Sequence, residues 1–361
     1  MRLVIDARML DHSGIGVYLR NVLPDVLRRC AGLRPLVLTL PSLLATTREL
    51  ACDDTEVRAW SAPPLSLSEI VAPFRVERDD VWWSPHYNVP LLSRSALIVT
   101  LHDLLPLADA DVEARGYKRA AVRLWLKRIR HRALRVLCVS QFTRDQAVRL
   151  GGIARGKTSV IHLGVGREWV NAAPAAQASD PPYVVFVGLM KRHKNVLGLL
   201  HAFAQAAESI PHHLLLVARH TGLRDSDERA VALARRMAPR VQLLESVPQP
   251  RLIELVANAD LLVQPSFHEG FGLPALEAMA AGTPVLAAEA GAMPEICGDA
   301  AIYCDPHSRD DMAAAMRRVL GSVELRRQMR ERGRIRAERF RWESCAQATS
   351  DALIAACRHP Q

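Results

Sequence analysis

A turn between a short apolar run and a helical stretch carries two glutamates at a fixed spacing. In "SFHEGFGLPALEAMAAGTP" (266–284), Glu269 and Glu277 form an E-x7-E pattern. Gly270 and Gly272 would let backbone N–H groups approach an anion, and a helix N-terminus favours negative charge. Glu277 could accept hydrogen bonds from hydroxyls such as those of a ribose. The alternative is two solvent-facing glutamates flanking a tight strand–helix turn.

A second cluster of candidate residues is cationic. The stretch "GLMKRHKN" (188–195) continues directly from an apolar run typical of a buried strand. When a bond to a diphosphate breaks, the departing group needs fixed positive charge, which Lys or Arg supply where no metal is present. The alternative is a basic turn that is merely solvated.

A regular alternation of strand and helix patterns positions both clusters. From residue 183 onward, short apolar runs such as "YVVFVGLM" and "DLLVQPS" alternate with helical stretches such as "NVLGLLHAFAQAAE". Fully apolar strands separated by helices predict a parallel sheet covered on both faces. The first half shows the same pattern less regularly, in runs such as "RLVIDARM" and "SALIVTLHD". In such sheets ligands bind at the carboxyl ends of the strands, where the glutamate turn lies.

Length and alternation together predict an α/β protein of two Rossmann-like, doubly wound domains facing each other across a cleft. We expect the N-terminal domain over 1–170 and the second domain over 183–340. Between them, "NAAPAAQASDPP" (171–182) is rich in Ala and Pro and lacks periodicity, which predicts a linker. The last segment, 341–361, is expected to form a helix that crosses back to the first domain.

Composition excludes several classes of protein. The chain of 361 residues is 49% apolar and 24% charged, which favours large cores and excludes extended disorder. No apolar run is long enough to span a bilayer, and "MRLVIDARML" predicts a buried strand and not a signal peptide. Seven widely spaced cysteines without a C-x-x-C predict reduced thiols in a cytoplasmic protein, with neither disulfides nor a zinc site.

The net charge of +9 indicates either a negatively charged partner or an Arg-rich solvated surface. Nucleic acid is disfavoured, because aromatic residues make up only 5% and no RNA-binding aromatic motif accompanies the basic ones. The basic segment "KRAAVRLWLKRIRHRALR" (118–135) could lie on anionic lipid, or it could pack on the first sheet with an arginine-rich outer face. "DAD" (109–111) matches the D-x-D of metal-dependent glycosyl transfer but is a common tripeptide.

The stretch "GGIARGKTS" (151–159) matches G-x-x-x-x-G-K-T, the Walker A pattern. A true P-loop follows a strand and opens into a helix, and here the order is reversed. The preceding "SQFTRDQAVRL" has helical spacing with Ser140 as its cap, and a strand follows. We therefore interpret Gly151 and Gly152 as a helix C-terminus, with Lys157 on the turn into the next strand.

Several segments together carry a resemblance to a known family. "EGFGLPALEAMAAGTPV" and "MPEICGDAAIYCDP" resemble the retaining glycosyltransferases of family 4, whose GT-B fold has two Rossmann-like domains. "DARMLDHSGIGVYLRNVL" resembles that family's opening strand, glycine loop and helix, and "TLHDLLPL" and "VSQFTRDQ" follow in the family's usual order. "SLSEI" and "WWSPHYNVPL" resemble mid-domain segments of the polysaccharide-building branch. The resemblance covers nearly the whole chain.

The resemblance implies roles for individual residues. Glu269 would lie against the transferred sugar, Glu277 would bind the nucleotide ribose, and His102 would contact the donor sugar, although His102 could also be a structural histidine at a strand end. Lys194 would bind the diphosphate, with Arg192 and then Arg219 as candidates for a second cation, since Leu189 and His193 stand where many members have Arg. The remaining donor-binding residues implied are Gly14, Gly16, Gly270, Phe271, Gly272 and Leu273.

The function implied is retaining transfer of a hexose from a nucleotide-diphosphate sugar, with GDP-mannose as the first expectation, without a metal or other cofactor. The acceptor would be a glycan or lipid-linked molecule in bacterial surface polysaccharide synthesis, at the cytoplasmic face of the membrane. Another GT-B sugar-nucleotide enzyme, such as an epimerase or a phosphorylase, is the alternative, and a basic nucleic-acid-binding protein is a remote one.

Overall fold

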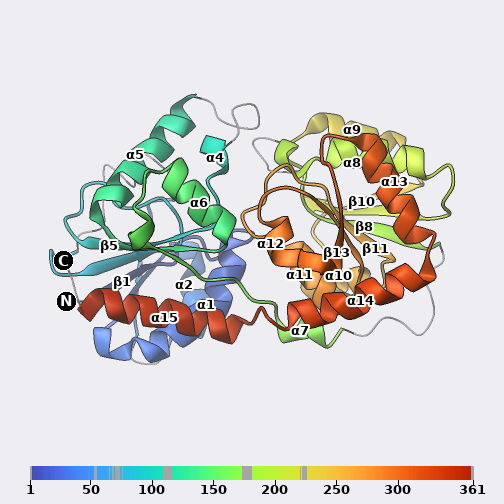
Figure 1. Cartoon of the computed structure of the whole chain (residues 1–361). Helices are drawn as coiled ribbons and strands as arrows, with labels where there is room; N and C mark the ends of the chain where they lie inside the picture. Colours follow the sequence, from blue (N-terminus) through green and yellow to red (C-terminus); the bar gives the residue numbers. More distant parts are fainter. Residues whose placement is uncertain are drawn as a thin grey trace. The chain divides into compact units, whose positions relative to one another are not determined.

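A computed structural model describes residues 2–52, 55–64, 66, 69, 74, 76–108, 116–172, 181–219, 221 and 226–358. The chain forms two compact units, Met1–Gly164 with Arg341–Gln361, and Val165–Phe340 (Figure 1). The first unit ends at Gly164, earlier than the boundary predicted at 170. The predicted metal motif at 109–111 and most of the predicted linker, 173–180, lie outside the described residues.

The described part of the first unit contains a seven-stranded parallel sheet in the order β3-β2-β1-β4-β5-β6-β7. Every residue of its central strands β1 and β4 is buried, which explains why these segments are apolar up to their last residues, Asp6 and Ser84. The strands are β1 (Leu3–Asp6), β2 (Leu36–Thr39), β3 (Glu56–Ala59), β4 (Val81–Ser84), β5 (Ala96–Leu101), β6 (Ala133–Cys138) and β7 (Thr158–Val160).

Helices cover both faces of this sheet. The C-terminal helix α15 (Trp342–Arg358) belongs to the first unit and packs along α1 (Ile15–Arg29) beside α2 (Leu44–Leu50), as Figure 1 shows. Among the described residues the unit also contains α4 (Leu105–Ala108), α5 (Gly116–Arg132) and α6 (Gln141–Arg149). The C-terminal segment that follows the second unit therefore returns to the first unit and packs on α1, the helix that follows β1.

The second unit has a six-stranded parallel sheet, counted over its described residues, in the order β10-β9-β8-β11-β12-β13. Its strands are β8 (Tyr183–Leu189), β9 (His213–Arg219), β10 (Val241–Leu244), β11 (Leu261–Gln264), β12 (Val285–Ala288) and β13 (Ala301–Cys304). The order reverses between β8 and β11, which is the switch point of a doubly wound sheet. The predicted α/β class is confirmed in both units.

The helices of the second unit form two layers (Figure 1). On one face lie α8 (Val196–Ala206), α9 (Glu228–Arg236) and α13 (Arg309–Leu320). On the other lie α10 (Gln249–Ala257), α11 (Leu273–Ala281) and α14 (Val323–Ala337), with α7 (Arg167–Val170) against α11 and α12 (Met293–Cys297) beside it.

The Walker-like stretch is a helix stop, as predicted. Ser140 caps α6 by accepting a hydrogen bond from the Thr143 N–H at 3.0 Å. Beyond α6, Gly152 has φ 64° and its N–H donates to the carbonyl of Val148 at 3.2 Å. Lys157 then lies in a single 3₁₀ turn, Arg155–Lys157, that leads directly into β7.

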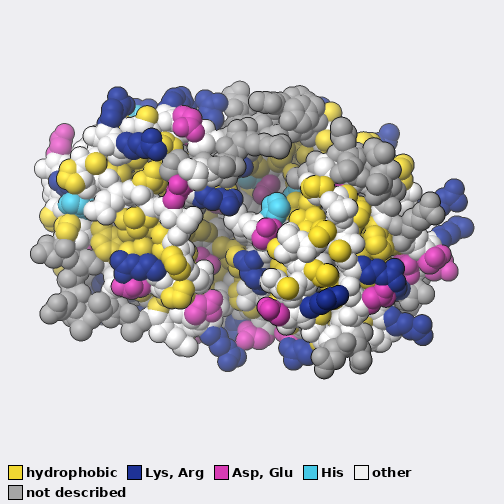
Figure 2. Space-filling view, turned by 180° about the vertical axis from the view of Figure 1, so that it is seen from behind, with side chains coloured by type: hydrophobic (Ala, Val, Ile, Leu, Met, Phe, Trp, Pro, Cys, Tyr) yellow, Lys and Arg dark blue, Asp and Glu magenta, His cyan; other side chains and the backbone are white. Residues whose placement is uncertain are grey.

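The basic segment around α5 packs on the first sheet. Its Val122, Trp125, Leu126 and Ile129 are buried in the core of the first unit, and only Leu124 of its larger apolar side chains is prominently exposed, at 51%. The aromatic and aliphatic side chains that would enter a lipid surface are thus occupied in the core. Figure 2 shows Lys and Arg side chains scattered among acidic and neutral ones on the face in view.

Two expectations from composition can be compared with the fold. The seven cysteines form no disulfide, and all are buried except the half-buried Cys52. Within the described ranges, none of the helices is both long enough and apolar enough to span a bilayer.

Candidate active site

The glutamate turn of the second unit follows β11 at the switch point of its sheet. The strand "LLVQ" is fully buried and ends in Gln264, and the turn runs through Ser266 to Glu269. On the neighbouring strand β8, a single 3₁₀ turn (Arg192–Lys194) follows the strand end and leads into α8. The ends of β8 and β11 therefore bring the two clusters found in the sequence to one place.

Glu269 receives three donors on one oxygen. Lys194 Nζ lies 2.7 Å from Glu269 Oε1, Gln264 Nε2 lies 2.6 Å from it, and Ser266 Oγ lies 2.8 Å from it. The side chain of Lys194 is 16% exposed and that of Glu269 is 9% exposed. No hydrogen bond to Glu269 Oε2 is found among the described residues, so this oxygen can accept from a ligand hydroxyl.

Electrostatics keeps this carboxyl ionised. Burial by itself raises the pKa of Glu269, but the charge and hydrogen bond of Lys194, together with the Ser266 hydroxyl, outweigh it and hold the pKa below its ordinary value. The pair thus presents a fixed carboxylate and a fixed ammonium. Lys194 has three N–H donors and uses one of them on Glu269.

The backbone of Glu269 is held by the loop that follows β12. The Ala292 N–H donates to the carbonyl of Glu269 at 3.0 Å, and Gly291 has φ 63°. A Cβ at Gly291 would lie 2.7 Å from the carbonyl oxygen of Glu269 and 2.8 Å from its nitrogen. Only glycine fits this contact, because a side chain would displace the glutamate.

The predicted anion-binding turn opens α11. Gly272 has φ 95° and precedes Leu273, the first residue of α11, with Pro274 in the first turn. This conformation favours glycine, and a Cβ there would also lie 2.6 Å from the sulfur of Met293. Phe271 is buried and packs edge-on against Phe340 at 5.9 Å between ring centroids. Gly270 and Leu273 lie in the same turn, whose helix N-terminus favours an anion.

Glu277 lies within α11, on its side facing α7. No hydrogen-bond partner for its carboxyl is found in the described part of the chain. Burial and the negative charge of Glu168 on α7 raise the pKa of Glu277 to about 8. At neutral pH this carboxyl is therefore mostly protonated, so it can donate one hydrogen bond to a hydroxyl and accept another, and its contact with a ribose stays a prediction.

The two candidate arginines both lie at the carboxyl-end edge of the sheet. Arg192 is exposed in the turn that holds Lys194, and Arg219 is exposed at the last position of β9, paired in register with Leu189. Neither makes an ion pair with Glu269, and the choice between them stays a prediction.

His102, in the first unit, follows β5. Its ring packs edge-on against Tyr18 at 5.1 Å between centroids, and its buried Nε2 has no hydrogen-bond partner within the described ranges. Burial and the nearby His86 lower the pKa of His102 to about 4. The imidazole is therefore neutral at neutral pH.

The glycine loop of the first unit precedes α1. Gly14 has φ 77° and open space around its Cβ position. A Cβ at Gly16 would lie 2.3 Å from the carbonyl oxygen of Leu10, so the chain folds tightly back on itself there. The loop is compact at Gly16, and its contact with a diphosphate stays a prediction.

Sequence reasoning missed several residues that shape these sites. Gln264 and Ser266 complete the set of hydrogen-bond donors around Glu269. The sequence feature that could have revealed Gln264 is a polar residue at the end of an otherwise apolar strand. Gly291 was missed because its role depends on a contact across the sheet. Glu168 was missed for the same reason.

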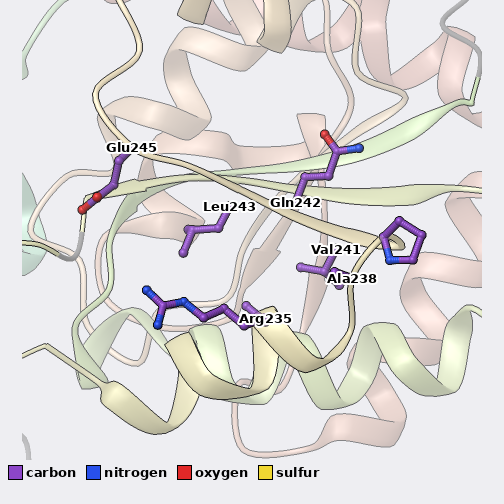
Figure 3. Close-up of a pocket in the computed structure, with 8 residues that line it drawn as sticks. Arg235, Ala238, Val241, Gln242, Leu243 and Glu245 are labelled. Carbon is purple, nitrogen blue, oxygen red and sulfur yellow. The ribbon is translucent and has the colours of Figure 1, made fainter.

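A cavity of about 450 Å³ lies elsewhere in the second unit (Figure 3). Arg235 of α9 and Gln242, Leu243 and Glu245 of the β10 segment line it at the edge of the sheet. It lies at the opposite side of β9 from the switch point and brings together none of the predicted site residues.

Comparison with known proteins assigns both parts of the chain. Residues 169–336 match the family described as "Glycosyl transferases group 1", and residues 70–169 match "Glycosyltransferase Family 4". O-antigen chain mannosyltransferase B of Escherichia coli is 27% identical over 288 residues, covering 76% of this chain and 74% of that protein. MMP alpha-(1->4)-mannosyltransferase of Mycolicibacterium hassiacum is 29% identical over 288 residues, covering 72% of this chain and 67% of that protein.

Comparison with solved structures shows the same fold. The structure of Anabaena HepE in complex with UDP and glucose superimposes with a TM-score of 0.77 at 19% identity, covering 98% of this chain and 100% of that one. Two parallel α/β units and the matched segments define the class, the GT-B glycosyltransferases. Within that class the chain belongs to the family 4 glycosyltransferases, as its motifs predicted.

Proposed function

We propose that the protein is a retaining, metal-independent glycosyltransferase that moves a hexose from a nucleotide-diphosphate sugar to a glycan or lipid-linked acceptor. The observation that carries this proposal is the buried Lys194–Glu269 pair beside the N-terminus of α11. A fixed ammonium and a helix N-terminus suit a diphosphate, and a fixed carboxylate suits sugar hydroxyls. GDP-mannose is the first donor to test, because two relatives are named mannosyltransferases.

In the proposed reaction the bond between the anomeric carbon and the diphosphate oxygen breaks, and its electron pair leaves with the diphosphate. The acceptor oxygen forms its bond to the same carbon on the same face, and its proton passes to the departing phosphate. Lys194 stabilises the charge that develops on the leaving group, with Arg192 or Arg219 as the second cation. Glu269 holds the sugar, Glu277 holds the ribose, and His102 is assigned to the donor sugar.

A thermal-shift panel of GDP, UDP, dTDP and ADP tests the donor class. Only a nucleotide that binds the folded state stabilises it, so a rise in Tm with GDP alone would support a GDP-sugar. Mass spectrometry of nucleotide sugars incubated with the protein then separates the reactions: transfer or hydrolysis supports the proposal, an altered sugar epimer indicates an epimerase, and a sugar phosphate indicates a phosphorylase. No stabilisation by any nucleotide would refute the proposal.

Kinetics on Lys194→Ala tests the role of the cation. An interaction that strengthens as the leaving group departs lowers kcat more than it raises the donor KM when it is removed. Unchanged turnover would exclude Lys194 from the phosphate role.

Location at the cytoplasmic face of a membrane remains part of the proposal. Since Val122, Trp125, Leu126 and Ile129 of α5 are buried in the core and Leu124 is exposed, attraction to anionic lipid would rest mainly on the Lys and Arg residues of this helix. Co-sedimentation with anionic vesicles at low salt, reversed by high salt, is the expected result.

A further inference from the structure

A chain of buried polar side chains lies at the switch point of the first sheet. Arg8 follows β1 and is fully buried, with Nε 2.8 Å from Asp6 Oδ1 and Nη2 2.6 Å from Asp6 Oδ2. Its Nη1 donates to the carbonyl of Ala62 at 2.8 Å, and its guanidinium also bonds to Glu69. The guanidinium stacks 3.7 Å above the Trp60 ring. This arginine is therefore fixed on every side.

The chain continues to a histidine whose tautomer it determines. Asn88 Nδ2 donates to Glu69 Oε1 at 3.2 Å, because a carboxylate can only accept from it. The amide orientation that results turns Asn88 Oδ1 towards His86, 2.9 Å from Nδ1. Since Oδ1 can only accept, Nδ1 of His86 carries the proton and Nε2 carries the lone pair. Among the described residues no second hydrogen bond of the His86 ring is found.

A second histidine, His102, lies near His86, and its ring is also neutral with an unprotonated Nε2. The backbone of Pro85 accepts a hydrogen bond from the His102 ring, and His102 Nε2 is the buried atom without a partner. Burial lowers the pKa of both His86 and His102 to about 4, and Asp103, His12 and Asp6 are the charged or titratable groups that act on His86. Both rings therefore keep a lone pair on Nε2 at neutral pH.

The position matches that of the Lys194–Glu269 pair in the second unit. The order of the first sheet reverses between β1 and β4, and Arg8 follows β1 while His86 follows β4. In doubly wound sheets the crevice at this point binds ligands. In the second unit the residues at this position carry fixed charge, which suits a diphosphate. Here the residues carry two neutral acceptors, which suit neutral hydroxyl groups.

We propose that His86, with its ring fixed by the Arg8–Glu69–Asn88 chain, binds a hydroxyl of the acceptor sugar through Nε2. The inference rests on the proposed glycosyl transfer, in which the charged groups of the second unit take the nucleotide sugar. His86 is then an acceptor-binding residue, and Asn88 and Glu69 are positioning residues that act through it.

Binding of soluble methyl glycosides tests this proposal. Saturation-transfer NMR on the full chain would use the α-methyl glycosides of mannose, glucose and rhamnose, with the nucleotide that stabilises the protein present. We expect at least one glycoside to bind the wild type. His86→Ala should weaken that binding roughly five- to tenfold, the loss of one neutral hydrogen bond. Asn88→Leu keeps the ring but frees its tautomer, and should weaken binding in the same direction.

The nucleotide-induced rise in Tm, measured on the same samples, separates the possible failures. The nucleotide-induced rise in Tm should be unchanged in both variants. If His86→Ala fails to fold, glycoside binding by Asn88→Leu tests the proposal instead. His131→Ala is the matched control, because His131 is exposed and lies before the amino end of β6, whereas His86 follows the carboxyl end of β4. Absence of glycoside binding, or equal binding by wild type and variants, would overturn the proposal even where a nucleotide binds. Absence of any nucleotide effect would instead count against the proposed transfer.

Discussion

Replacing Lys194 with methionine isolates the charge of the buried pair, because the side chain keeps most of its length and loses its ammonium. Removing one partner of a buried ion pair costs about 3–5 kcal/mol when the other charge is left without compensation. Here Gln264 and Ser266 continue to donate to Glu269, at 2.6 and 2.8 Å, and each such bond offsets about 1 kcal/mol. We therefore expect Lys194→Met to lower the free energy of unfolding by about 2 kcal/mol near neutral pH.

The cost should depend on pH in a defined direction. In the wild type the folded pKa of Glu269 lies below its unfolded value, so its contribution to stability is present above the unfolded pKa and lost as pH falls through the folded pKa. Without Lys194, burial is the largest remaining effect and raises the pKa, so the ionised carboxyl opposes folding. The difference in stability between the two proteins should be large near neutral pH and shrink on acidification towards pH ~4.

Urea unfolding at several pH values, followed by hydrogen exchange of α11 amides, measures this difference within the second unit. Lys191→Met, in the same loop, is the matched control for the loss of a lysine that does not pair with Glu269. A stability loss for Lys194→Met that is constant between neutral and acidic pH would refute the electrostatic explanation. It would indicate that the lysine acts through the packing of its methylene groups instead.

Three further predictions follow from the same contacts. The pKa of Glu277 in the folded protein is raised to about 8, so the protein loses stability as the pH rises from the unfolded pKa of this carboxyl to about 8. Glu277→Gln should therefore raise Tm at alkaline pH but not at acidic pH. Glu168→Gln should raise Tm in the same pH range by a smaller amount. Gly291→Ala should lower kcat sharply and stability by about 1–2 kcal/mol, measured by transfer assay and urea unfolding, since its Cβ collides with the backbone of Glu269. Lys157→Ala should leave the nucleotide-induced rise in Tm unchanged, because this lysine lies in a turn after a helix stop.

Much of the fold was predictable because its signals are local. Strands buried on both faces are apolar along most of their length, with polar residues such as Asp6 at their carboxyl ends, and glycine is needed where a helix ends in the left-handed conformation, as at Gly152. The unit boundary was less predictable. Val165–Val170 joins the second unit because α7 packs on α11, a contact that no local pattern in "GREWV" encodes.

The basic segment shows where composition misleads. Its arginines and its Trp125 suggest a helix that meets lipid, yet periodicity alone cannot tell a face that meets lipid from one that meets a sheet. In the structure the face with Trp125 and Ile129 meets the sheet, because both side chains belong to the first core. Because the apolar face of α5 is buried against the sheet, its Lys and Arg residues lie on the opposite face.

The two switch points show what a sequence can and cannot disclose about a site. Lys194 and Glu269 were each found from local patterns, although they lie 75 positions apart and their pairing was not predicted. Their pairing could have been inferred, since a doubly wound order places the ends of the strands before them side by side. The same reasoning applied to the first half would pair the residues after "LVID" with those after "VWWS". It leads to Arg8 and His86, the position where we propose that a second ligand binds, so that proposal follows from the topology more than from any motif.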